Sequence, residues 1–137
     1  MKENEPFFKI SGHALIKKEN KFLVVRRCLT DDYMPGKWDI PGGTVEFEEN
    51  IFQCVEREVL EESNLTIKIN KPIFVHDHIN GLRHQFEIVY DCDYQSGEVK
   101  LNLEDHDEYR WATLREMESL PKITFLEELL KYLKKNV

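Results

Sequence analysis

The sequence predicts a mixed α/β (α+β) fold, in which strands, a helix, further strands and a final helix follow one another. Its 137 residues are a usual length for one domain, so residues 1–137 are expected to form a single domain. Hydrophobic residues make up 41% and charged residues 33% of the chain, as is typical of globular soluble proteins. The order of elements favours a mixed sandwich over a regular βαβ repeat.

Two strands and a loop are predicted before the first helix. Residues 7–17 and 22–28 are rich in apolar residues typical of strands, and the polar residues between them form a turn. A loop of turn-forming residues follows at 29–37. Residues 38–40 are then expected to be extended, because Pro41 disfavours helical backbone in the residue before it. The pair Gly42-Gly43 lets the backbone approach a ligand closely.

Residues 50–63 carry the clearest helix signal. Asn50 is a good N-cap, and Gln53 three residues later completes a capping box. Asn64 stands where a helix needs a residue in the left-handed conformation, for which Asn is the best choice after Gly. The apolar residues that fall on one arc of this helix are expected to face the core: Ile51, Phe52, Val55 and Val59.

The second half of the chain predicts a hairpin, a short strand and a terminal helix. Residues 65–78 and 82–94 have strand character, with Asn80-Gly81 as the turn between them. Residues 108–112 form another short strand, and 114–120 a short helical turn. Residues 123–135 are predicted to form an amphipathic helix, because their apolar residues recur at helical spacing: Phe125, Leu126, Leu129, Leu130 and Leu133.

Charge and composition exclude several classes of partner. A net charge of −7 argues against a long nucleic acid, whose binding depends on basic patches, but allows a small phosphorylated ligand bridged by divalent cations. No apolar stretch approaches the ~18 residues of a membrane span, and the first ten residues lack a signal-peptide core. The three cysteines are an odd number, far apart, and fit a reducing compartment. A cytoplasmic location is therefore expected.

Acidic residues gather in the segment 46–62, which holds seven glutamates and one basic residue, Arg57. Glu58, Glu61 and Glu62 lie at i, i+3 and i+4 of the predicted helix and so share one face, where like charges repel. A hard divalent cation removes that repulsion, and a few oxygen ligands that leave room for water and phosphates suit Mg²⁺. A solvated acidic helix face is the alternative. The preceding Pro-Gly-Gly turn and the arginine inside the cluster favour a site.

Residues 43–65 resemble the Nudix box. Eight positions match its pattern at fixed spacing: Gly43, Glu49, Arg57, Glu58, Val59, Glu61, Glu62 and Leu65. Residues 37–42 and 108–112 are similar to the family's approach to the box and to its late strand. The resemblance implies a Nudix fold, a mixed sheet sandwiched between helices. It also implies hydrolysis, dependent on Mg²⁺ or Mn²⁺, of a nucleoside diphosphate linked to another moiety.

The resemblance also implies roles for individual residues. The metal ligands would be Glu58, Glu61, Glu62 and the backbone carbonyl of Gly42. Arg57 would hold Glu49 and orient the cluster through charge-assisted hydrogen bonds. The proton of the attacking water would go to Glu61 or to an acid in the loop at 104–107, where Glu104 and Asp105 are the candidates. Two positions depart from the family, Asn64 in place of a Gly and Glu48 where a Gly is frequent, and the second predicts either local backbone strain or a changed path of the loop.

Residues outside the box are expected to contact the substrate. Arg26 and Arg27 end a strand and face opposite sides, so one of them is a candidate for binding a phosphate. Gly43 allows close approach, and Trp38 is either a stacking surface for a base or part of the core. The expected partner is a small nucleoside diphosphate derivative, with a homodimer as one option for assembly. A Nudix-like domain that only binds a nucleotide or a protein is the alternative to an enzyme.

Overall fold

The computed structural model describes residues 4–136 and contains seven strands and three helices within them. In chain order they are β1 (Phe7–Lys18), β2 (Lys21–Arg27), β3 (Trp38–Asp39), β4 (Gly42–Thr44), α1 (Ile51–Ser63), β5 (Thr66–Asn80), β6 (Arg83–Ser96), β7 (His106–Ala112), α2 (Leu114–Glu118) and α3 (Thr124–Lys135). The predicted order of strands and helices is confirmed. The strand β4 was not anticipated, and β7 begins two residues earlier than expected.

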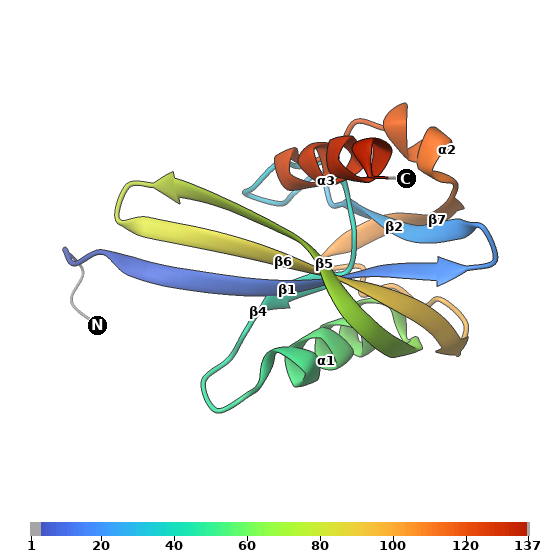
Figure 1. Ribbon diagram of the computed structural model, residues 1–137, viewed down its shortest axis with the longest axis horizontal. Coiled ribbons are helices and arrows are strands. Elements are labelled where there is room, and N and C mark those ends of the chain that lie inside the picture. Colours follow the sequence, from blue (N-terminus) through green and yellow to red (C-terminus); the bar gives the residue numbers. More distant parts are fainter. Residues whose placement is uncertain (1–3, 137) are drawn as a thin grey trace.

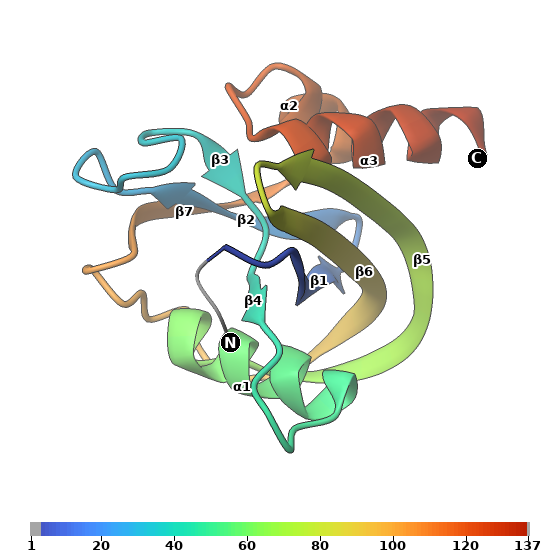
Figure 2. The same cartoon turned by 90° about the vertical axis from the view of Figure 1, so that its left-hand side faces the viewer.

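The strands form one mixed sheet with the order β3-β2-β1-β6-β5, while β4 pairs with β1 and β7 pairs with β2. The central pair β1 and β6 is parallel, and the other pairs are antiparallel. The strand β5 bends through a wide arc (Figure 2), and its pairing with β6 shifts register at three places. Register shifts of this kind bend a strand. The curvature makes one face of the sheet concave.

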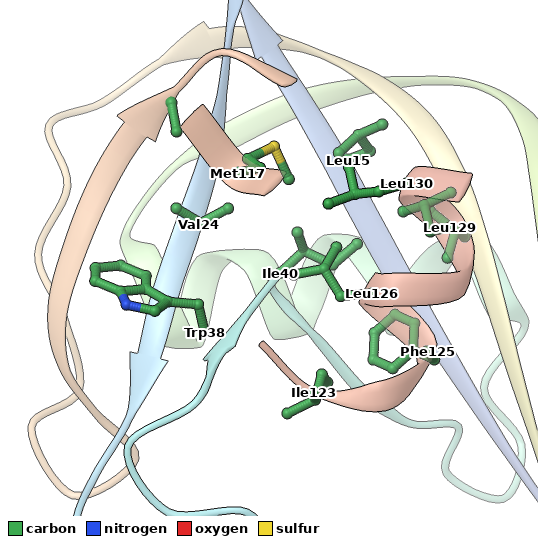
Figure 3. Close-up of a cluster of buried hydrophobic side chains, with 12 residues drawn as sticks. Leu15, Val24, Trp38, Ile40, Met117, Ile123, Phe125, Leu126, Leu129 and Leu130 are labelled. Carbon is green, nitrogen blue, oxygen red and sulfur yellow. The ribbon is translucent and has the colours of Figure 1, made fainter. Parts of the chain in front are cut away.

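Helices cover both faces of the sheet, with α1 on one side and α2 and α3 on the other (Figure 1). The core is accordingly split into two clusters. Leu15, Val24 and Val89 pack against α2 and α3 (Figure 3), whereas Ala14 and Ile16 pack toward α1. Successive residues of one strand therefore serve opposite cores, because side chains alternate between the faces. This is why residues 14–16 of β1 and 23–25 of β2 are continuously apolar.

Two local predictions were wrong. The β5–β6 hairpin turns at Gly81 and Leu82, one residue later than expected, and Gly81 supplies the positive φ of 62°. Asn80 is the last residue of β5, paired with Arg83. Phe52 is 49% exposed and does not face the core, because the buried side of α1 is centred on Cys54, Val55 and Val59. The Phe52 ring lies at the edge of this buried side, against Tyr90.

Both ends of α1 are built as predicted. The Asn50 side chain accepts from the backbone N–H of Gln53 at 2.9 Å, and the Gln53 side chain accepts from the backbone N–H of Asn50. Asn64 adopts the left-handed conformation, with φ 67° and ψ 15°. Glu48 also has a positive φ of 69°, a conformation that costs a residue with a Cβ about 1 kcal/mol. The loop before α1 therefore carries the strain expected from the missing glycine.

Between residues 4 and 136, no helix has the length and apolar composition needed to cross a bilayer.

The left-handed Asn64 predicts how stability responds to substitution there. Asn64→Val is expected to lower the free energy of unfolding by about 1 kcal/mol or more, because a β-branched residue resists this conformation. Asn64→Gly is expected to leave it unchanged or slightly raised, since Gly adopts the conformation freely. Urea unfolding of the three proteins measures this difference. Equal stabilities would contradict the proposed terminator role.

Candidate active site

Two cavities meet beside the strand β4 and the C-terminal half of α1. A smaller cavity of about 350 Å³ is lined mainly by acidic residues, and a larger cleft of about 600 Å³ runs along the concave face of β1, β6 and β5. The residues common to both are Arg27, Asp39, Gly42 and Gly43. A ligand in the cleft therefore has direct access to the acidic cavity.

Carboxylates from α1 and from the loop before β7 converge on the smaller cavity, to which Glu58, Glu61 and Glu62 contribute from one face of the helix. Asp105 contributes from the opposite side, because the β2–β7 pairing brings its loop across. The rest of the lining consists of Arg27, Asp31, Asp39, Ile40, Gly42, Gly43 and His106. The structure thus brings together acids that are more than 40 residues apart in the sequence.

Arg57 organises the acids of α1. Its guanidinium donates twice to Glu49, at 2.7 and 3.0 Å, and also to Glu58 at 2.9 Å and Glu61 at 3.3 Å. A further hydrogen bond reaches the backbone carbonyl of Thr44 at 3.3 Å. The contact with Glu49 is bidentate, the geometry that fixes a guanidinium most firmly. The expected pairing of Arg57 with Glu49 is present in this structure.

The environment of each acid shifts its pKa differently. The hydrogen bonds from Arg57 and then from the backbone N–H of Glu46 lower the pKa of Glu49 to about 2. Burial raises the pKa of Glu62 to about 9, with the nearby charge of Glu58 adding to the effect. Burial also raises the pKa of Glu58, against the opposing influence of Arg57. Glu58 and Glu62, both half-buried, therefore bear an electrostatic cost that Arg57 and the Gly42 amide relieve only in part, and a cation would reduce it further.

Gly42 and Gly43 make the close approach of α1 possible. The backbone N–H of Gly42 donates to Glu62 at 3.0 Å, and a Cβ on Gly43 would stand 2.4 Å from the Glu58 carboxyl carbon. Any side chain at Gly43 would therefore displace Glu58. The partner that approaches these glycines in the structure is the acidic helix, and their close approach to a ligand stays a prediction.

The oxygen donors fit a hard divalent cation, although Arg57 now holds some of them. Between residues 4 and 136, no three His, Cys, Asp or Glu side chains converge as a preformed metal cage. Instead, Arg57 binds the carboxylates of Glu58 and Glu61, while Glu62 faces the Gly42 amide. An all-oxygen set in a polar cavity with space for water suits Mg²⁺ or a similar ion.

A polar ladder forms the floor of the larger cleft. His13 Nε2 contacts Glu87 Oε2 at 2.5 Å, and Gln85 Nε2 donates to the Ser11 hydroxyl at 3.0 Å. The His13 ring also lies against Phe125 at the start of α3, with centroids 4.4 Å apart. His13 is 6% exposed and sits beside Gly42, so it marks the point where the cleft meets the acidic cavity.

The structure separates the two candidate arginines. Arg27 lines both cavities and donates to Asp31 at 2.9 Å and Asp39 at 3.2 Å. Arg26 lines neither of them and pairs outside with Asp107 and Glu108. The pairing of β2 with β7 shifts register between the two arginines, which are also on opposite sides of the strand.

Two other predicted site residues lie outside the cavities. Trp38 is 3% exposed within the core that α2 and α3 cover (Figure 3), and Arg110 lies over its ring at 5.1 Å. Its proposed role as a stacking surface is therefore wrong, because no face of the indole is open. Glu104 is exposed and lines neither cavity, whereas its neighbour Asp105 lines the smaller one.

Sequence reasoning missed Asp39 and the pairing of His13 with Glu87. Asp39 is 5% exposed, lines both cavities and is paired with Arg27. Burial raises the pKa of its carboxyl. The sequence signal for Asp39 was its position between the apolar residues Trp38 and Ile40, in a short segment predicted to be extended. His13 and Glu87 are 74 residues apart and have no comparable signal in the sequence.

Comparison with known protein families shows which family this chain belongs to. The family model described as the NUDIX domain matches residues 9–133, nearly the whole chain. The chain belongs to the Nudix family. Nudix hydrolases generally use divalent metal ions and act on small nucleotide derivatives, and the chain is a pyrophosphohydrolase of this family. The resemblance seen in residues 43–65 is thereby confirmed.

Relatives within the Nudix family agree with this assignment. An ADP-ribose pyrophosphatase from Methanocaldococcus jannaschii is 30% identical over 121 residues, which cover 87% of this chain and 68% of that protein. A nucleoside triphosphatase, NudI, from Escherichia coli is 30% identical over 109 residues, covering 72% and 77%. The crystal structure of a MutT protein from Methanosarcina mazei superposes with a TM-score of 0.84 at 29% identity, covering 98% and 99%. The mixed sheet between helices is therefore the Nudix fold.

The contact between Gly43 and Glu58 predicts the effect of a single methyl group. Gly43→Ala is expected to lower turnover by at least about 10-fold, because the added Cβ moves a carboxylate that faces the cavity. Phe47→Ala is the control, since Phe47 follows β4 in the same loop, is 96% exposed and lines neither cavity. Steady-state assays on both proteins check this prediction. Normal turnover in Gly43→Ala would show that Glu58 can move without consequence.

The two arginines predict an unequal response in substrate binding. Arg27→Ala is expected to raise KM for a nucleotide substrate by about 10-fold or more, because it removes the guanidinium that lines both cavities. Arg26→Ala should change KM less than about twofold, since an exposed ion pair contributes little. If neither substitution alters KM, phosphate binding depends on other groups.

Proposed function

We propose that this chain is a Mg²⁺- or Mn²⁺-dependent hydrolase that cleaves the pyrophosphate linkage of a nucleoside diphosphate derivative. The observation that supports it most is the acidic cavity, where Glu58, Glu61 and Glu62 face Asp105 next to a cleft of nucleotide size. A domain that only binds a nucleotide has no need of several glutamates around one arginine. Buried carboxylates are expensive unless something neutralises them.

We assign metal binding and the positioning of the carboxylates to different residues of the chain. Glu58, Glu61 and Glu62 would hold the metal, with the Gly42 carbonyl as a further candidate ligand. A bound divalent ion neutralises the diphosphate and lowers the pKa of an attacking water. Arg57 keeps the carboxylates in position through its bonds to Glu58 and Glu61 and through its anchor on Glu49. It acts on the reaction through the acids that it orients.

Two acids remain candidates for accepting the proton of the attacking water. Glu61 lines the cavity, and its side chain is 57% exposed with one hydrogen bond from Arg57. Asp105 lines the same cavity from the opposite side and accepts from the Asn102 side chain at 3.1 Å. Both are accessible from the cavity, as a general base requires. Glu104 is the weaker candidate, since it lines neither cavity.

The names of the relatives bear on the substrate. One relative is an ADP-ribose pyrophosphatase and another a nucleoside triphosphatase, and both names describe phosphoanhydride cleavage in a nucleotide. We propose the same bond type for this chain and a nucleoside diphosphate linked to a further moiety as the substrate class. The three cysteines are free and buried, which fits a reducing compartment, and the cytoplasm is part of this proposal.

Loss of one carboxylate tests the catalytic role of the cavity. Glu61→Gln keeps the size of the side chain and removes its charge, so the fold should persist while turnover falls at least about 100-fold, roughly 2.7 kcal/mol of barrier. Glu56→Gln is the matched control, because Glu56 is exposed on the same helix and lines neither cavity. A panel of nucleotides with Mg²⁺, followed by phosphate and pyrophosphate release, measures both variants.

Metal addition gives a readout that does not need a substrate. Millimolar Mg²⁺ or Mn²⁺ is expected to raise the melting temperature of the unmodified protein by mass action, and to raise that of Glu61→Gln less. A melting temperature indifferent to both ions, with no hydrolysis of any diphosphate, would instead favour a domain that only binds. Near-normal turnover in the glutamine variants of Glu58, Glu61 and Glu62 would place the metal elsewhere.

A further inference from the structure

The larger cleft ends in a group of basic side chains, far from the acidic cavity. This outer end of the cleft consists of Lys9 on β1, His76 and His78 on β5, and Arg83 on β6. In Figure 1 these strands extend to the left, beyond both α1 and α3. The register puts all four on one face, because Lys9 and His78 both pair with Gln85, two positions from Arg83.

The two permanent cations at the outer end have no counter-ion. Neither Lys9 nor Arg83 forms an ion pair with any residue between 4 and 136. Arg83 Nε and His76 Nδ1 are shielded from solvent and have no hydrogen-bond partner. Glu87, the acid nearest along β6, is already engaged by His13. The outer end therefore offers positive charge and unsatisfied polar atoms at once.

The unpaired cations of the outer end differ from the other arginine of the cleft. The chain has a net charge of −7, and the other arginine of the cleft, Arg27, is neutralised by Asp31 and Asp39. Lys9 and Arg83 are both half-buried against the cleft, whereas cations that serve solubility extend freely into solvent. A partly desolvated cation without a partner is costly, and a bound anion removes that cost.

The outer end lies at a defined distance from the acidic cavity. His13 pairs with Gly42 at the junction of the two cavities, and Lys9 is four residues earlier on the same strand. At about 3.3 Å per residue, this places the Lys9 level roughly 13 Å from the junction. A sugar or nucleoside joined to a diphosphate at the junction spans a comparable length.

We propose that the outer end of the cleft binds a second anionic group of the substrate, a phosphate or a carboxylate carried by the moiety farthest from the scissile diphosphate. This inference rests on the proposed function, because it takes the diphosphate to lie at the acidic cavity. Arg83 supplies a forked guanidinium that matches either anion, and Lys9 adds a second charge. His76 and His78 add ring nitrogens beside them. The preferred substrates are then doubly anionic, with charge at both ends.

Two pairs of compounds separate the sources of the anion. UDP-glucuronate differs from UDP-glucose by a carboxylate, and the 2′-phosphate of ADP-ribose differs from ADP-ribose by a phosphate. The unmodified protein is expected to prefer the anionic member of at least one pair by about 10-fold in kcat/KM, which corresponds to 1.4 kcal/mol. The pair that shows the preference identifies the anion as a carboxylate or a phosphate.

Substitution of the cations tests whether the outer end causes the preference. Arg83→Gln and Lys9→Gln should each reduce the preference to less than about 3-fold. Arg115→Gln and Lys17→Gln are the matched controls, because both residues are exposed and line neither cavity, and Lys17 is on the same strand as Lys9. Both controls should retain the full preference.

The outcomes separate this inference from the proposed function. Two results overturn the anion site and leave the proposed function in place. One is hydrolysis of UDP-glucose and ADP-ribose with no preference for the more anionic member of either pair. The other is a preference that persists in Arg83→Gln. If the unmodified protein hydrolyses neither these four compounds nor any other diphosphate of the nucleotide panel, the proposed function fails. Dissociation constants measured calorimetrically in EDTA then test the anion site. Equal dissociation constants within both pairs overturn it. Tighter binding of the more anionic compound supports it, provided that Arg83→Gln abolishes the difference.

Discussion

The site depends on one close contact, the approach of α1 to the backbone of β4. Four of the contacts that shape the cavity cross this interface: the Gly42 amide to Glu62, the Thr44 carbonyl to Arg57, the Gly43 carbonyl to Cys54, and the Gly43 Cα face against Glu58. Only glycine leaves space for them. Gly12, which pairs with Gly43, extends the same requirement to β1, since a Cβ there would stand 2.8 Å from the Val55 side chain. The acidic face of α1 lies directly against the backbone of β4 because no side chains separate the helix from the strand.

This contact also explains how a strongly acidic helix face tolerates burial. Arg57 neutralises Glu49 and shares its remaining donors between Glu58 and Glu61, while Glu62 has only a backbone amide for compensation. The pKa values of these acids therefore differ widely, because the pKa of Glu49 is lowered and that of Glu62 is raised. Glu49 therefore anchors Arg57, while Glu58, Glu61 and Glu62 face the cavity.

The concave sheet then joins two regions of opposite character. The acidic cavity lies where β4 and α1 meet, and the basic outer end lies where β1, β5 and β6 extend past the helices (Figure 1). The polar ladder of His13, Glu87, Gln85 and Ser11 connects them along the floor. The helix α3 covers only the inner part of this face, so the strands at the basic outer end extend beyond it (Figure 1). A substrate with charge at both ends matches this division.

The sequence by itself determined the elements and the acidic cluster, because both depend on local rules. The capping box of Asn50 and Gln53, the left-handed Asn64 and the shared face of Glu58, Glu61 and Glu62 all follow from spacings within four residues. Only the tertiary structure decided that Arg27 and not Arg26 enters the site, that Trp38 is buried, and that Asp39 and His13 join it. These outcomes depend on strand register and on contacts between distant segments, such as the 74 residues between His13 and Glu87. A one-residue change of register reverses the face of every side chain, and no local pattern in the sequence reports it.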